Sequence, residues 1–115
     1  MRFHFVKQLD AMQCGVACLA MICKYYKNAY SIEALSKLCS VSTEGVSLFA
    51  IKNAAEKIGF NSVYGKASIE QLVTISLPSI LHWNQNHFVV LYKVKSKKKF
   101  YIADPGKGLM CYSLE

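Results

Sequence analysis

The segment spanning residues 14–27 is the feature that most restricts how this 115-residue chain can fold. Apolar side chains occupy nearly every side of a helix drawn over it. They are Val16, Ala17, Leu19, Met21, Ile22, Tyr25 and Tyr26. A helix that is apolar all round has to be buried, so other elements must cover it on several sides. Hydrophobic residues make up 53% of the chain and charged residues 18%, which fits a single domain over residues 1–115.

Two further helices are expected in the first half of the chain. Ser31 is suited to cap a short helix that runs through Leu38, because serine oxygens accept hydrogen bonds from the first helical N–H groups. Ser42 or Thr43 precedes a third helix, which is expected over residues 47–58 with Gly59 as its C-terminal stop.

The second half of the chain changes to the period of β-strands. A capping box from Ser68 to Gln71 predicts one short helix near Leu72. Strands are expected over residues 60–66, 77–83, 88–94 and 100–103, the last two joined as a hairpin. Helices followed by antiparallel strands make an α+β domain, with the helical half packed on the sheet.

Location and charge give weaker indications. No run of 18 apolar residues is present, and residues 1–8 lack the features of a signal peptide, so a cytosolic location is the default. The net charge is +7, and no nucleic-acid-binding motif accompanies it, so no nucleic acid partner is expected. Five lysines in one short stretch carry much of this charge: Lys93, Lys95, Lys97, Lys98 and Lys99. The stretch is either a solvated turn between two strands or a patch for an acidic peptide or an anionic membrane surface.

The five cysteines have irregular spacings and include no CxxC pair. Zinc and thioredoxin-type sites therefore have little support, and we expect neither a metal nor a cofactor. Reduced thiols that pack as small buried hydrophobes explain most of them.

Cys14 is the cysteine best placed for chemistry. It follows Gln13 and precedes Gly15 at the start of the apolar helix, where the positive end of the helix dipole favours a thiolate nucleophile. Gln8 lies six residues earlier, and its amide could donate to an oxyanion together with the Cys14 backbone N–H. The alternatives are that Cys14 is one more buried cysteine and that Gln8 is an ordinary surface glutamine.

A general base is sought among three histidines. His87 opens the strand at 88–94, and a base at the end of a rigid strand can face a cleft. His82 is the alternative base, and His4 is expected to be structural.

Asp104 is the candidate for the group that orients the histidine. If the hairpin loop has four residues, Val94 pairs with Lys99 and Asp104 becomes a diagonal neighbour of His87. A slip of one residue would place Asp104 on the other face of the sheet. Residues 104–106, Asp-Pro-Gly, also suit a simple turn.

The order Gln8, Cys14, His87, Asp104 is that of an oxyanion donor, nucleophile, base and orienting group in a papain-like thiol peptidase. A thiol redox protein is a rival that would need Cys18 as its resolving cysteine. Cβ atoms four residues apart on a helix are about 5–6 Å apart, whereas a disulfide needs about 3.5–4.5 Å.

These motifs resemble those of a known family. Residues 8–22 are similar to the nucleophile motif of the C39 peptidases, and residues 87–91 and 102–105 are similar to the family's histidine and aspartate motifs. C39 peptidases are N-terminal domains of ABC transporters that process bacteriocins and other secreted peptides. The resemblance covers nearly the whole chain.

The resemblance implies a papain-like fold and cleavage of leader peptides after a Gly-Gly pair, coupled to export. It gives catalytic roles to Cys14, His87 and Asp104 and an oxyanion-hole role to Gln8. It further implies that the domain continues past Glu115 into membrane helices and an ATPase, on the cytoplasmic side of the bacterial inner membrane.

Two points qualify the resemblance. The family commonly has Asp or Glu before the cysteine, where this chain has Gln13. The family also includes domains that lost the cysteine and only bind the leader, so a non-catalytic leader-binding module is the alternative function. The presence of Cys14 argues against that alternative.

Overall fold

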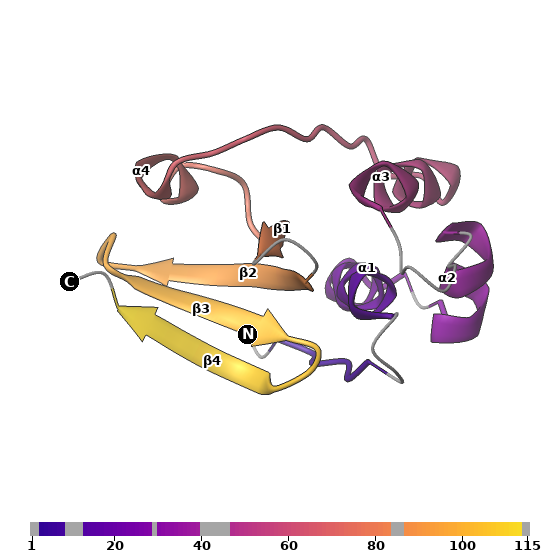
Figure 1. Ribbon diagram of the computed structural model, residues 1–115, viewed down its shortest axis with the longest axis horizontal. Coiled ribbons are helices and arrows are strands. Elements are labelled where there is room, and N and C mark those ends of the chain that lie inside the picture. The colour runs from indigo at the N-terminus through magenta and orange to yellow at the C-terminus, as the bar shows by residue number, and fades with distance from the viewer. Residues whose placement is uncertain (1–2, 9–12, 29, 40–46, 84–86, 114–115) are drawn as a thin grey trace.

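The computed structural model describes residues 3–8, 13–28, 30–39, 47–83 and 87–113. Its elements are α1 (Cys14–Tyr25), α2 (Ile32–Cys39), α3 (Leu48–Lys57), α4 (Ile69–Leu72), β1 (Ser79–Trp83), β2 (His87–Lys95), β3 (Lys99–Asp104) and β4 (Gly108–Ser113). The strands form an antiparallel sheet in the order β1-β2-β3-β4. In Figure 1 the first three helices lie at one end of the molecule and the sheet at the other. The predicted α+β class is confirmed.

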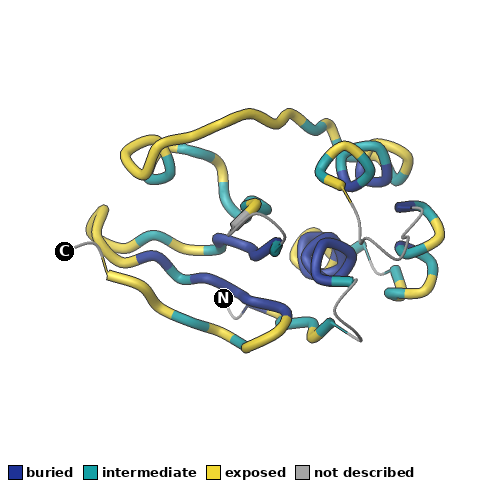
Figure 2. Tube along the Cα trace, viewed as in Figure 1, coloured by how far each residue is buried: buried dark blue, intermediate teal, exposed yellow. Residues whose placement is uncertain are grey.

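Helix α1 lies between the other helices and the sheet, as its sequence requires. Every residue from Cys14 to Cys23 is buried, and Figure 2 shows the helix as a dark blue coil. One flank of α1 packs against α2 and α3 around Leu35 and Ala54. The other flank faces β2 and β3, where Cys14, Cys18 and Met21 share a core cluster with Phe88, Val90 and Ala103.

The predicted caps at Ser31 and Ser68 and the stop at Gly59 are confirmed. Helix α1 ends at Tyr25 rather than at Lys27. Ser47 caps α3, and the expected start at Ser42 or Thr43 lies outside the described residues. The hydroxyl oxygens of Ser31 and Ser47 accept from backbone N–H groups three residues later. Ser68 and Gln71 form both bonds of a capping box. Gly59 ends α3 with φ +105°, a backbone angle that residues with a side chain rarely adopt.

In the second half one predicted strand is absent and one observed strand was not predicted. Residues 60–66 form no strand, and within this segment Val63 is 96% exposed. Figure 1 shows the segment crossing from α3 to α4 away from the sheet. Strand β4 was not expected, because most of its residues are exposed and its sequence lacks a buried strand's pattern.

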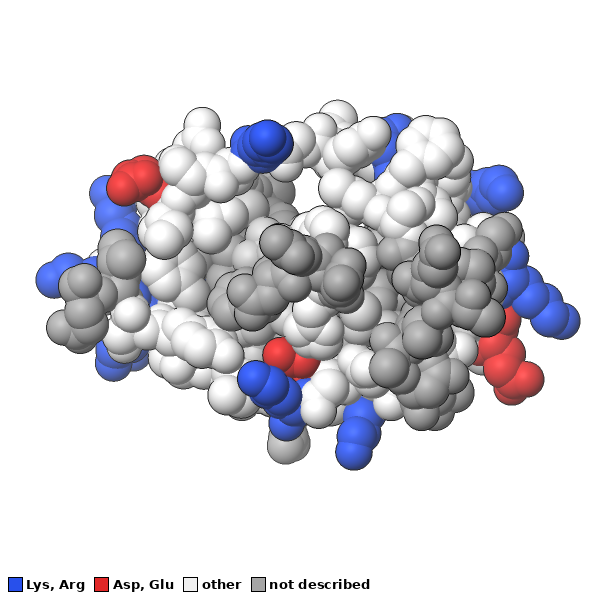
Figure 3. All heavy atoms as spheres, in the orientation of Figure 1, with Lys and Arg blue, Asp and Glu red and all other residues white. Residues whose placement is uncertain are grey.

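The turn of the β2–β3 hairpin also differs from expectation. Lys95 pairs with Lys99 and Val94 with Phe100, so the loop has three residues rather than four. The predicted pairing of Val94 with Lys99 is therefore wrong. The five lysines of this hairpin are exposed. In Figure 3 lysine side chains lie around the rim of the molecule.

An irregularity in β2 restores the expected alignment near the site. The register shifts between Leu91 and Lys93, so that Leu91 faces Ile102 and Val90 faces Ala103. This is a β-bulge, which places one extra residue in β2. Beyond the bulge the strands follow the register that the sequence analysis had assumed, and Asp104 lies on the same face as His87.

The far face of the sheet carries a second apolar layer. Val89, Leu91, Phe100 and Ile102 form its buried cluster, and Leu72 of α4 packs on it. No helix within the described ranges is long and apolar enough to cross a membrane.

Glycine 59 provides a test of the α3 terminus. We expect Gly59→Ala to lower the free energy of unfolding by about 1–2 kcal/mol, because alanine is strained at this positive φ. Gly65→Ala is the matched control, since a Cβ at either position meets no atom within 4 Å and Gly65 lacks the positive φ. Urea denaturation measures the free energy of unfolding of both variants. Equal stability of the two variants would contradict the assignment of strain to Gly59.

Candidate active site

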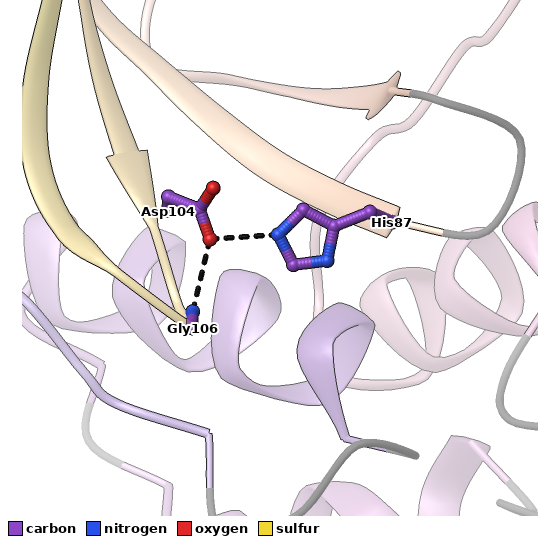
Figure 4. A network of polar contacts seen from close by, with 3 residues as sticks. All are labelled: His87, Asp104 and Gly106. Carbon is purple, nitrogen blue, oxygen red and sulfur yellow. Dashed lines mark hydrogen bonds and ion pairs between the residues drawn. The ribbon is translucent and has the colours of Figure 1, made fainter.

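His87 and Asp104 form the central polar contact of the site. His87 is the first residue of β2, and its Nε2 lies 2.7 Å from Oδ1 of Asp104, the last residue of β3. Asp104 is only 3% exposed, so this contact is largely shielded from water. The same Oδ1 accepts a second hydrogen bond from the Gly106 backbone N–H at 2.9 Å. Figure 4 shows Asp104 between these two partners.

The contact fixes the orientation of the histidine ring. Because Nε2 faces Asp104, the ring nitrogen that remains for a nucleophile is Nδ1. Figure 4 shows this second nitrogen turned away from Asp104, on the edge of the ring nearer to α1 in that view. A carboxylate that orients the ring in this way also stabilises the imidazolium that forms during proton transfer.

Cys14 lies in the same corner of the molecule. It is the first residue of α1 and is 5% exposed. Its core cluster includes Phe88 and Ala103, the chain neighbours of His87 and Asp104. The structure therefore brings Cys14 to the ends of the two strands that carry the histidine and the aspartate.

Cys18 lies one turn further along α1. Burial raises the pKa of its thiol well above the ordinary value, and the nearby Cys14 and Asp104 raise it further. A raised pKa disfavours the thiolate that a resolving cysteine needs, which weakens the redox alternative.

Gln8 lies beside the turn that follows β3. Its backbone N–H donates to the Pro105 carbonyl at 3.0 Å. A Cβ placed on Gly106 would lie 3.4 Å from Gln8 Oε1 and 3.6 Å from Asp104 Oδ1. The turn at residues 104–106 thus holds the orienting carboxylate and also positions Gln8, an arrangement that sequence spacing did not reveal.

The other histidines are placed differently. His82 is an exposed residue of β1 whose ring stacks on Phe88, with centroids 4.5 Å apart. His4 is exposed in the N-terminal segment. Of these three described histidines, His87 alone contacts a carboxylate, which supports the choice of His87 over His82.

All five cysteines lie in the described part of the chain and carry thiols rather than disulfides. Burial raises the pKa of both the Cys23 and the Cys39 thiols from 9.0 to about 11. Cys111 is exposed on β4. Within the described residues no group of three His, Cys, Asp or Glu side chains is arranged to hold a metal ion.

Comparisons with known proteins identify the family of this chain. The family model described as "Peptidase C39 family" matches residues 2–115. The lactococcin-G-processing and transport ATP-binding protein LagD of Lactococcus lactis is 42% identical over 90% of this chain. The colicin V secretion/processing ATP-binding protein CvaB of Escherichia coli is 32% identical over 99% of it. The matched region spans only 15% and 16% of these two relatives.

Solved structures are similar over nearly the whole chain. One is a double glycine motif protease from an AMS/PCAT transporter in complex with the leader peptide. It superposes with a TM-score of 0.92 at 35% identity, covering 97% of this chain and 80% of that one. The peptidase domain of Streptococcus ComA gives a TM-score of 0.84 at 27% identity, covering 97% of this chain and 87% of that one.

The buried thiols predict how stability depends on pH. In the unfolded chain Cys23 and Cys39 lose their protons near pH 9, whereas in the folded protein they keep them until about pH 11. The folded state therefore binds more protons in this window, and the free energy of unfolding falls as the pH rises from 9 to 11. We expect a loss of about 1–2 kcal/mol per thiol.

Denaturation at several pH values measures this slope. Cys23→Ala and Cys39→Ala should each flatten it between pH 9 and 11, whereas Cys111→Ala, which removes an exposed thiol, should not. An unchanged slope in the two buried-site variants would contradict the assignment.

Proposed function

This chain belongs to the peptidase C39 family of cysteine peptidases, and we propose that it cleaves double-glycine leader peptides with Cys14 as nucleophile, His87 as general base and Asp104 as orienting group. The observation that carries this proposal is the 2.7 Å contact between His87 Nε2 and the buried Asp104 carboxylate. The contact leaves Nδ1 for the thiol of Cys14, which begins the neighbouring helix. Two relatives support the substrate class, one a double glycine motif protease and the other a lactococcin-G-processing protein.

The proposed reaction begins with proton transfer from the Cys14 thiol to His87 Nδ1. The thiolate attacks the carbonyl carbon of the second glycine and forms a tetrahedral oxyanion. The Gln8 amide and the Cys14 backbone N–H donate hydrogen bonds to this oxyanion. His87 then protonates the leaving amine, and water releases the acyl group from the sulfur.

Glycine at both positions before the cut fits a narrow passage beside Cys14. The nucleophile is 5% exposed, so an approaching peptide has little room for side chains next to the attacked carbonyl. A glycine pair supplies only backbone at this point.

We further propose that the chain is the peptidase domain of a longer exporter. The matched relatives are named as processing and transport ATP-binding proteins, and this chain matches 15% of LagD. Its partners would then be the membrane and ATPase domains of an ABC transporter. The domain would act on leader-bearing peptides at the cytoplasmic side of the bacterial inner membrane.

The nucleophile is tested with a panel of double-glycine peptides and mass spectrometry. Wild-type protein should release the leader after the second glycine, and Cys14→Ala should release none, because the attacking sulfur is gone. Cys111→Ala removes an exposed thiol far along the chain and should cleave normally. Undiminished cleavage by Cys14→Ala would refute the assignment, and leader binding by wild type without product would favour a binding module.

The base is tested by comparing two histidine variants. We expect His87→Ala to reduce kcat/KM at least ~1,000-fold, because the thiol loses its proton acceptor. His82→Ala removes an exposed ring on β1 and should change kcat/KM by less than about threefold. The reverse ranking would identify His82 as the base.

A further inference from the structure

Gln13 directly precedes the proposed nucleophile and has an uncommon setting. It is the N-cap residue of α1, yet its side chain makes no capping hydrogen bond to the helix. The first turn of α1 also contains no acidic residue. Glutamine is not among the preferred N-cap residues, unlike the serines that cap α3 and α4. Another contact must therefore hold the start of α1 in place.

That contact is made with α2. Gln13 Nε2 donates a partly buried hydrogen bond of 3.1 Å to Ser36 Oγ, although the two residues are 23 positions apart. Gln13 Oε1 is buried as well, and no hydrogen-bond partner for it lies among the described residues. The Gln13 side chain thus lies between α1 and α2 and links them through a partly buried hydrogen bond.

Helix α2, which accepts this hydrogen bond, is itself held in place by the core. Leu35, the neighbour of Ser36, is fully buried, as is Cys39, and both pack in the cluster that contains Val16 and Leu19 of α1. A bond to Ser36 therefore ties the N-cap residue of α1 to an element that the core already holds.

From these contacts we infer that Gln13 is a positioning residue: its bond to Ser36 fixes the start of α1 and so directs the Cys14 sulfur toward His87. Cys14 follows Gln13 in the chain, so a rotation of the backbone at Gln13 would swing the sulfur away from Nδ1. Displacements of this kind are costly because bond formation requires reacting atoms at close, aligned contact. The inference rests on the proposed function only in naming Cys14 as the nucleophile.

The neutral amide is the second part of this inference. Among the described residues, the titratable groups of this corner are Cys18 on the same helix as Cys14, Asp104 on β3 and His87, which contacts Asp104, whereas Glu33 and Lys37 of α2 are exposed. A carboxylate at position 13 would add a negative charge one residue from the sulfur and oppose formation of the thiolate. The amide of Gln13 makes the bond to Ser36 without adding that charge.

The experiment uses two readouts on four variants, all in a Cys111→Ala background that removes the exposed thiol. The variants are Gln13→Leu, Ser36→Ala, the double variant of both, and Gln13→Glu. The first readout is kcat/KM for a double-glycine peptide. The second is the rate constant for alkylation of Cys14 by iodoacetamide as a function of pH, which needs no peptide substrate.

We expect Gln13→Leu and Ser36→Ala each to lower kcat/KM roughly tenfold, because the start of α1 is released. The double variant should also lose roughly tenfold rather than a hundredfold, since both changes remove one interaction. Gln13→Glu keeps a partner for Ser36, so its alkylation rate at high pH should equal that of wild type. The low-pH side of its profile of alkylation rate against pH should move to higher pH, so that alkylation at pH 7 is severalfold slower than in wild type.

Ser31→Ala is the matched control for loss of α2 stability. Ser31 caps α2 through the Ala34 N–H, whereas Gln13 bonds to Ser36, so this variant should weaken the helix and leave alkylation unchanged. The inference is overturned if Ser31→Ala matches Ser36→Ala, if the single losses multiply, or if Gln13→Glu leaves the low-pH side of the profile in place. Absence of peptide cleavage with the expected alkylation pattern would refute the proposed function and leave the role of Gln13 intact.

Discussion

Burial of α1 is the constraint on which the rest of the structure depends. The helix has no polar side to turn toward water, so it is covered by α2 and α3 on one flank and by the sheet on the other. Cys14 and Cys18 lie four residues apart and share the flank that faces the sheet. The requirement to bury an apolar helix thereby also carries Cys14, the proposed nucleophile, to the strands that bear His87 and Asp104.

Within that frame, the site depends on adjacent strands and on one turn. His87 and Asp104 come from β2 and β3, which are hydrogen-bonded neighbours, so the sheet fixes their relative placement. The turn after β3 then takes part in two hydrogen bonds: the Gly106 backbone N–H donates to Asp104 Oδ1, and the Pro105 carbonyl accepts from the Gln8 backbone N–H. Concentrating these contacts in a few residues preorganises the polar groups, which is the main way in which enzymes lower the cost of charge development.

The position of each cysteine decides whether its thiol is available for chemistry or only fills space in the core. Cys18, Cys23 and Cys39 are buried, and burial raises the pKa of each thiol, so they stay protonated and act as small apolar groups. Cys111 is exposed on β4, remote in sequence from the other four. Cys14 differs because it begins a helix at the ends of the strands that carry His87 and Asp104.

The sequence by itself determined most of the local elements and pointed to the residues of the proposed site. The apolar run of α1, the caps at Ser31 and Ser68 and the stop at Gly59 depend on hydrogen bonds and dihedral preferences within a few residues, and these could be predicted. Tertiary structure alone decided the three-residue hairpin loop and the bulge near Tyr92, which together align Asp104 with His87. It also decided that residues 60–66 remain unpaired and that Gln13 reaches Ser36. Such features depend on which distant segments meet in the core, and neither periodicity nor spacing records those contacts.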